Sequence, residues 1–99
     1  MAEAIILEFN GKGVDIPALY HTVNGLLGVD ESGKGDWPDG IESHTAGTQG
    51  DSFVVFEVWE SQAKQEEFMN SRLGPALAQA NAPAPTRVEW FSVIGQGPN

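Results

Sequence analysis

Short hydrophobic runs between Gly-rich turns predict four strands, and apolar residues at helical spacing predict two helices. The strands are expected at residues 4–9, 41–46, 52–60 and 86–94, and the helices at residues 15–27 and 61–80. The order β-α-β-β-α-β is that of a ferredoxin-like α+β fold. Right-handed crossovers would place both helices on one face of a four-stranded antiparallel sheet. We therefore expect a single domain over residues 1–99, whose second sheet face is left uncovered by its own chain.

Both predicted helices have recognisable beginnings. Asp15 is a suitable N-cap for the first helix, and Pro17 fits its first turn. One face of this helix is apolar and comprises Ile16, Leu19, Tyr20, Val23 and Leu27, which leaves His21 on the solvent side. Ser61 is a natural N-cap for the second helix. Gly74-Pro75 is expected to kink or break that helix before it ends near Ala80.

Side chains alternate along a strand, so the strand at 52–60 has two faces. The unbroken apolar set Val54, Phe56 and Val58 is expected to pack under the helices. The opposite set is Phe53, Val55, Glu57 and Trp59. With a turn at Gln49-Gly50, Glu42 would lie opposite Glu57 and His44 opposite Val55, which makes His44 diagonal to Glu57. Glu42, His44 and Ala46 would then share the uncovered face of the sheet.

An uncovered face that is aromatic and partly ionisable has two interpretations. It can be a homodimer interface, with its Glu residues at a wet rim. Alternatively, two such faces can enclose a pocket with apolar walls and a few convergent polar groups, as is typical of small-molecule sites. Carboxylates paired across the hairpin, or leaning on His44, would then supply a general acid or base.

Composition narrows the classes of function. The chain has 14 acidic and 5 basic residues, a formal net charge of −9, and no Cys. Such a charge disfavours nucleic acids and anionic membrane surfaces as partners, and the lack of Cys excludes thiol nucleophiles and thiolate metal sites. No segment is apolar enough to span a membrane, and the N-terminus lacks the pattern of a signal peptide, so a cytoplasmic protein is expected.

Three segments are more specific than the general pattern. His44, Ala46 and Gly47 form a His-x-Ala-Gly strand end, and residues 58–61 form a Val-Trp-Glu-Ser junction between strand and helix. Residues 72–77 form an Arg-Leu-x-Pro-Ala-Leu helix end. In this order, and over roughly residues 4–95, the chain resembles the dimeric α/β-barrel superfamily, near the antibiotic-biosynthesis-monooxygenase-like proteins and in a branch of unassigned activity.

The resemblance implies a homodimer with its sheets packed face to face and a cavity between sheet and helices in each subunit. Enzymes of the superfamily include cofactor-free monooxygenases, haem-degrading oxygenases, and isomerases or cyclases. The haem-ligating His that haem-degrading members carry on the second helix has no counterpart at residues 61–80, which disfavours haem degradation. The Asn that oxygenases of the superfamily carry on the first strand is also missing, and AIILEF offers Glu8 instead.

The candidate site follows from both arguments. His44 and Glu57 are the candidate catalytic residues, and the candidate substrate-binding residues are Glu42, Phe53, Val55, Trp59, Arg72 and Trp90. Arg72 could anchor a ligand carboxylate or simply pair with Glu66 or Glu67. Trp37 could close over the pocket as a lid, or its ring could simply be held down on a solvated loop. No metal or cofactor is expected, because the chain has no metal-binding spacing motif and no nucleotide-binding motif.

These candidates favour a cofactor-independent monooxygenase, isomerase or cyclase that acts on a small hydrophobic or aromatic compound. The alternative is a non-catalytic homodimer that binds a small molecule or only assembles. A closed and fully packed interior would favour assembly, whereas a pocket that reaches His44 would favour ligand chemistry.

Overall fold

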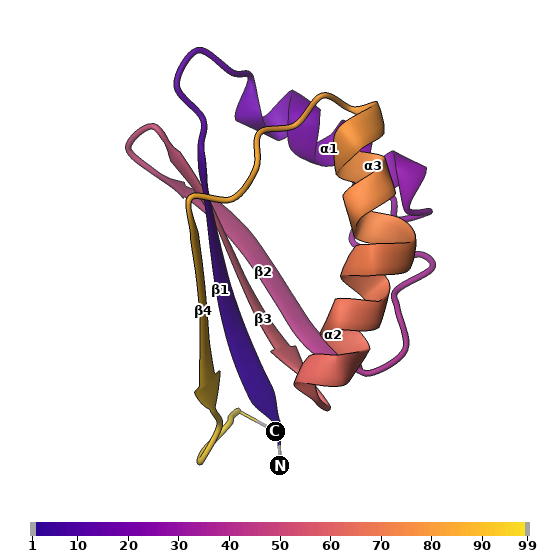
Figure 1. The fold of residues 1–99 in the computed structure, drawn as a ribbon, viewed down its shortest axis with the longest axis vertical. Helices are drawn as coiled ribbons and strands as arrows, with labels where there is room; N and C mark the ends of the chain where they lie inside the picture. The colour runs from indigo at the N-terminus through magenta and orange to yellow at the C-terminus, as the bar shows by residue number, and fades with distance from the viewer. Residues whose placement is uncertain (1, 99) are drawn as a thin grey trace.

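A computed structural model describes residues 2–98 of the chain. The elements follow one another as β1 (Glu3–Asn10), α1 (Ile16–Leu26), β2 (Ile41–Gln49), β3 (Ser52–Trp59), α2 (Gln62–Phe68), the π-helical turn η1 (Met69–Leu73), α3 (Gly74–Gln79) and β4 (Arg87–Ser92). The strands form one antiparallel sheet of order β2-β3-β1-β4, and the helices cover one of its faces (Figure 1). The predicted ferredoxin-like α+β fold is confirmed.

Helix α1 begins as the sequence predicts. The side chain of Asp15 accepts a hydrogen bond from the backbone N–H of Ala18, and Pro17 occupies the first turn. His21 is exposed, whereas Val23 is buried. The polar side of α1 therefore faces solvent and its apolar side faces the interior.

The kink or break expected at Gly74-Pro75 takes the form of a change in helix type, after which the helix continues to Gln79. Pro75 has no N–H to donate, and the chain widens into the π-helical turn η1 just before it. Within this turn the N–H of Gly74 bonds to the carbonyl of Met69, five residues earlier. The helix therefore absorbs the proline by a change of hydrogen-bond register, and α2, η1 and α3 stack end to end (Figure 1).

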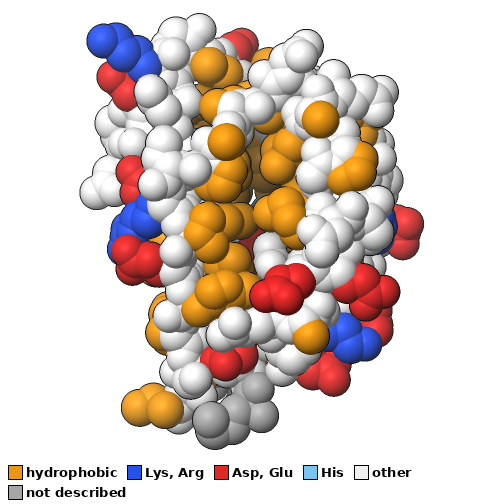
Figure 2. All heavy atoms as spheres, viewed as in Figure 1, with side chains coloured by type: hydrophobic (Ala, Val, Ile, Leu, Met, Phe, Trp, Pro, Cys, Tyr) orange, Lys and Arg blue, Asp and Glu red, His pale blue; other side chains and the backbone are white. Residues whose placement is uncertain are grey.

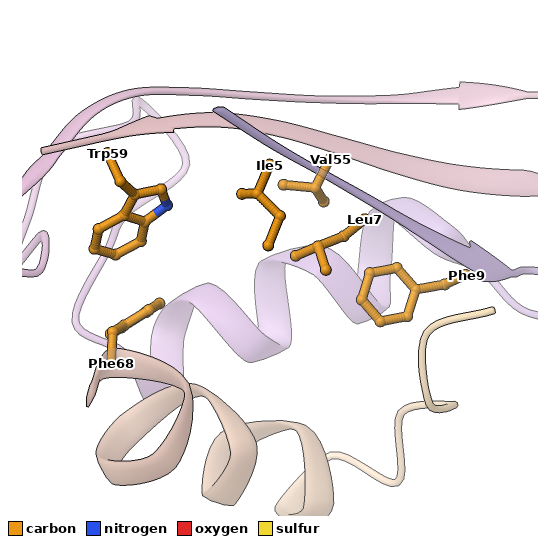
Figure 3. Packing of buried hydrophobic residues seen from close by; sticks show 6 residues of the cluster. All are labelled: Ile5, Leu7, Phe9, Val55, Trp59 and Phe68. Carbon is orange, nitrogen blue, oxygen red and sulfur yellow. The ribbon is translucent and has the colours of Figure 1, made fainter. Parts of the chain in front are cut away.

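The two faces of β3 are the reverse of the prediction. Phe53, Val55, Glu57 and Trp59 point toward the helices, and Trp59 is 0% exposed, whereas Phe56 is 38% exposed on the outer face. The core cluster comprises Ile5, Leu7, Phe9, Val55, Trp59 and Phe68, and lies between sheet and helices (Figure 3). Both faces of β3 are apolar, so the carboxylate of Glu57 decided the prediction, and it is buried with hydrogen-bond partners instead of facing water.

The register of the β2–β3 hairpin also differs from the prediction. The turn lies at Gly50 and Asp51, so that Gln49 pairs with Ser52 and His44 lies directly opposite Glu57. Gly50 adopts the left-handed backbone (φ +58°) that this tight turn requires. A register irregularity between Ile41 and Ser43 displaces Glu42, which is exposed and does not face Glu57.

Across residues 2–98 no helix has both the length and the apolar character needed to cross a membrane.

Candidate functional site

A cavity of about 90 Å³ lies between the sheet and the helices. Its walls come from β1, α1, β3 and the second helix, and most lining side chains are hydrophobic. They include the whole apolar face predicted for α1, namely Ile16, Leu19, Tyr20, Val23 and Leu27. In the space-filling view, hydrophobic side chains follow a hollow between the sheet and the helices (Figure 2). The interior is therefore not fully packed.

One wall of the cavity carries His44 and Glu57. The Nδ1 atom of His44 lies 2.6 Å from Oε2 of Glu57, and the Glu57 side chain is almost fully buried. On the other side of the imidazole, Nε2 lies 2.7 Å from the hydroxyl of Tyr20 on α1. Strand pairing places His44 beside Glu57, and the cap at Asp15 fixes the helix that carries Tyr20.

Trp59 supports this group from behind. Its Nε1–H donates to Oε1 of Glu57 over 3.0 Å, and its ring packs against Phe68. Because Trp59 is fully buried and does not line the cavity, it cannot stack on a ligand there. The indole of Trp59 instead fixes the position of the Glu57 carboxylate, which in turn fixes the imidazole of His44.

The loop at residues 28–40 closes over the same wall. Trp37 lines the cavity, and its ring centroid lies 5.0 Å from that of His44. Its Nε1–H donates to the carbonyl of Gly33, which fixes the indole to the loop itself. Trp37 is therefore held down on its own loop, as one of the two interpretations expected, and its ring also lines the cavity.

The loop has its own internal framework. The carboxylate of Asp30 accepts hydrogen bonds from the hydroxyl of Ser32 and from the backbone N–H of Ser32 and of Lys34, which hold the pKa of Asp30 below its usual value. A bridge between Val29 and Gly35 needs glycine at position 35, since a Cβ there would collide with the carbonyl of Gly28. The loop is thus a folded structure with a defined shape.

Two basic side chains attach the loop to the second helix. Arg72 donates to the carbonyls of Leu27 and Asp36 over 2.8 and 2.9 Å and lies over the ring of Phe68. Lys64 pairs with Asp39, and its hydrogen bond and charge lower the pKa of the Asp39 carboxyl. The sequence suggested that Arg72 either anchors a ligand or pairs with Glu66 or Glu67. Both interpretations are wrong, because Arg72 does not line the cavity and bonds to Leu27 and Asp36 instead.

The predicted site residues fall into two groups. His44, Glu57, Phe53 and Val55 line the cavity together. The other four do not line the cavity. Glu42 is exposed at the hairpin irregularity, and Trp90 packs on the core cluster from β4. Trp59 bonds to Glu57, and Arg72 bonds to the loop. No cluster of three potential metal ligands occurs in residues 2–98.

Tyr20 is the site residue that the sequence analysis did not select. It was assigned to the apolar face of α1, which is where it lies, and its hydroxyl was not considered. The available signal was its identity, because it is the single Tyr of the chain and it falls on a face otherwise made of aliphatic residues.

Solved structures with the same arrangement of elements were found across almost the full chain. A protein from Chloroflexus aurantiacus assigned as an antibiotic biosynthesis monooxygenase has a TM-score of 0.71 at 14% identity, with 99% of this chain and 98% of that chain covered. SnoaB from Streptomyces nogalater, described as a cofactor-independent oxygenase, has a TM-score of 0.68 at 13% identity over 99% and 98% of the two chains. The chain has the fold of the antibiotic-biosynthesis-monooxygenase-like proteins.

Rv0793 from Mycobacterium tuberculosis shares this fold, with a TM-score of 0.68 and 19% identity over 99% of this chain and 100% of that chain. No protein-family model and no curated protein matches the sequence itself. The resemblance noted from the sequence motifs is therefore confirmed for the antibiotic-biosynthesis-monooxygenase-like fold, and the chemistry has to be argued from the cavity.

Proposed function

We propose that this chain binds a small, uncharged, hydrophobic organic compound in the cavity and acts on it as a cofactor-independent monooxygenase, isomerase or cyclase. The observation that carries the proposal is the placement of the His44–Glu57 pair, whose carboxylate is almost fully buried, on the wall of a mainly apolar cavity. Apolar walls with a few convergent polar groups are typical of small-molecule sites. A His held by a carboxylate is a common general base in such sites.

Removal of a proton from the bound compound would be the first step of a monooxygenase or an isomerase reaction. The resulting anion can react with dioxygen, as in a monooxygenase, or take the proton back at a different carbon, as in an isomerase. The wall beside His44 supplies the base, and the apolar lining keeps water from competing for the proton. The description of SnoaB as a cofactor-independent oxygenase supports the oxygenase type of reaction for this fold.

1-Naphthol is a suitable probe, because it is flat, weakly acidic and uncharged at neutral pH. We expect it to bind the parent protein, with amide chemical-shift changes concentrated at residues that line the cavity. Val55→Phe, which fills the cavity, should weaken this binding at least about tenfold, whereas Val54→Phe on the outer face of the same strand should leave it unchanged. Equal binding by both variants would place the ligand elsewhere.

Turnover separates catalysis from binding. Dioxygen uptake with 1-naphthol would support the oxygenase type of reaction, and exchange of its ring hydrogens in D₂O would support reversible proton removal. Binding without either signal would favour the alternative, a non-catalytic homodimer that binds a small molecule. The exposed apolar outer face of the sheet is the observation that favours assembly as part of the function.

The partner we propose for that face is a second copy of the chain. Phe56 and Phe91 are 38% and 47% exposed there, and their ring centroids lie 6.1 Å apart across the strand between them. The outer face also carries Ile6 and Val54, next to the ion pairs that Arg87 makes with Glu8 and Glu89. Exposed aromatic side chains gathered on one face favour an interface. Two copies packed through these faces would cover both surfaces.

We expect sedimentation at micromolar concentration to show a dimer of the 10.6 kDa chain. Phe56→Asp should raise the dissociation constant at least about a hundredfold, because it buries a carboxylate in an apolar interface. Leu26→Asp, at a comparably exposed position on α1, serves as the control and should leave the dimer intact. A stable monomer of the parent chain would contradict the proposed assembly.

A further inference from the structure

The polar wall of the cavity is a single chain of hydrogen bonds. It runs from Tyr20 through His44 to Glu57 and ends at Trp59, with donor–acceptor distances of 2.7, 2.6 and 3.0 Å. Both ring nitrogens of His44 and both oxygens of Glu57 are used in it. His44 therefore has no nitrogen left for a ligand while Tyr20 stays in place.

The direction of this chain follows from its buried end. The Nε1–H of Trp59 can only donate, and it donates to Glu57. An ionised carboxylate accepts at both oxygens, so Oε2 takes the hydrogen from Nδ1 of His44. In the neutral imidazole Nε2 then carries a lone pair, and the hydroxyl of Tyr20 donates to it. With its hydrogen committed, the Tyr20 oxygen presents only lone pairs to the cavity.

The other residues that line the cavity supply no positive charge to balance the lone pairs that Tyr20 presents. None of the described residues that line the cavity is Lys or Arg. Apart from the hydrogen-bonded relay of Tyr20, His44 and Glu57, the polar lining residues are Asn10, Asn24 and Asp36. Asp36 is engaged by Arg72, and the side-chain oxygen of Asn10 accepts from the backbone of Lys12. A carboxylate or phosphate group in the cavity would therefore find no cation to pair with. At Tyr20 it would face a second hydrogen-bond acceptor instead of a donor.

We propose that Tyr20, and not His44, is the group that contacts the ligand, and that the cavity selects uncharged compounds carrying an O–H or N–H donor. This rests on the proposed function and names the reactive end of the same site. As the ligand O–H bond breaks, its proton goes to the Tyr20 oxygen, and the hydrogen of Tyr20 moves to Nε2 of His44. The electron pair stays on the ligand oxygen, and the imidazolium formed is paired with Glu57. His44 and Glu57 are thus positioning residues and proton carriers behind Tyr20.

The direction of the relay can be measured without a ligand. Nitrogen-15 NMR of the His44 ring in the parent protein should show Nδ1 protonated and Nε2 unprotonated. His21, exposed on α1, provides an internal reference for a ring that lacks such partners. Protonation of Nε2 alone would mean that His44 donates to Tyr20, which would leave the phenol free to donate to a ligand and would overturn the proposal.

The preference for donors is tested with a matched pair of ligands, 1-naphthol and its methyl ether, 1-methoxynaphthalene. Loss of one net hydrogen bond corresponds to roughly a 2- to 10-fold change in affinity. The ratio of the two dissociation constants should therefore shift by roughly that factor toward the ether in the double variant Tyr20→Phe with His44→Phe, in which neither the Tyr20 oxygen nor Nε2 of His44 is left to accept. Val88→Ala, at a half-exposed position on β4 that does not line the cavity, should keep the parent ratio.

An unchanged ratio in the double variant, with the fold intact by its amide spectrum, would overturn the preference for ligands that donate to the relay. If neither compound bound the parent protein, the proposed function would fail and the ligand preference with it. The direction of the relay would still be decided by the ring nitrogens of His44, so the two failures are distinguishable.

Discussion

Replacing Trp59 with alanine should lower the free energy of unfolding by about 3–5 kcal/mol, a large share of the stability of a domain of this size. The side chain is fully buried and packs against Phe68, so truncation leaves a large cavity in the core. It also removes the Nε1–H that donates to the buried carboxylate of Glu57. Denaturant unfolding of the parent and the variant measures the loss.

Val88→Ala is the control for this experiment. Val88 lies on β4 opposite Leu7 in the register of the sheet, but it is half exposed. We expect its loss to change the free energy of unfolding by less than about 1 kcal/mol. A Trp59→Ala variant that unfolds near the parent's midpoint would show that the residues facing the helices do not form the core.

The order of the elements is readable from the sequence because each carries its own local signal. Asp15 caps α1 as its position predicts, and the spacing of Ile16 and Val23 marks the side of α1 that faces the sheet. Ser61 caps α2, and its side chain accepts from the N–H of Lys64. None of these signals depends on a distant part of the chain, which is why they can be read directly.

The faces of β3 carry no such local signal. Val54 and Val55 are equally suited to either side of the sheet, so the one charged residue, Glu57, decided the prediction, and it decided wrongly. A carboxylate indicates a solvent-facing side of a strand only when the interior offers it no hydrogen-bond donors. Here His44 and Trp59 both donate to Glu57, and the position of His44 depends on the hairpin register.

Part of the site was predicted correctly, because it depends only on the alternation of side chains along two neighbouring strands. His44 and Glu57 were selected as an ionisable pair, and a register error of two residues kept them on one face, since side chains alternate with period two. Tyr20 reaches them from a helix that lies 24 positions earlier in the chain, and Arg72 reaches Asp36 across 36 positions. Contacts of this range depend on how the elements pack, so they are available only from the structure.

The wall of the cavity should also behave as an energetic unit. His44→Phe leaves the buried carboxylate of Glu57 with Trp59 as its remaining donor, and we expect it to lower the free energy of unfolding by about 3 kcal/mol. Glu57→Leu leaves the N–H groups of His44 and Trp59 without their acceptor, and a similar loss is expected. Each single change strands polar groups that the other residue had satisfied.

The double variant, His44→Phe with Glu57→Leu, removes the charge together with its partner. Its loss should be smaller than the sum of the two single losses by about 1–3 kcal/mol, because the pair is in direct contact and buried. The same cycle for Lys64 and Asp39, an exposed ion pair, gives the comparison, and its coupling should be smaller and should fade as salt is added. Coupling between His44 and Glu57 should persist in salt, since both side chains are shielded from solvent. Strictly additive losses would mean that the two residues stabilise the fold independently, and the relay from Tyr20 to Glu57 would then lose its physical basis.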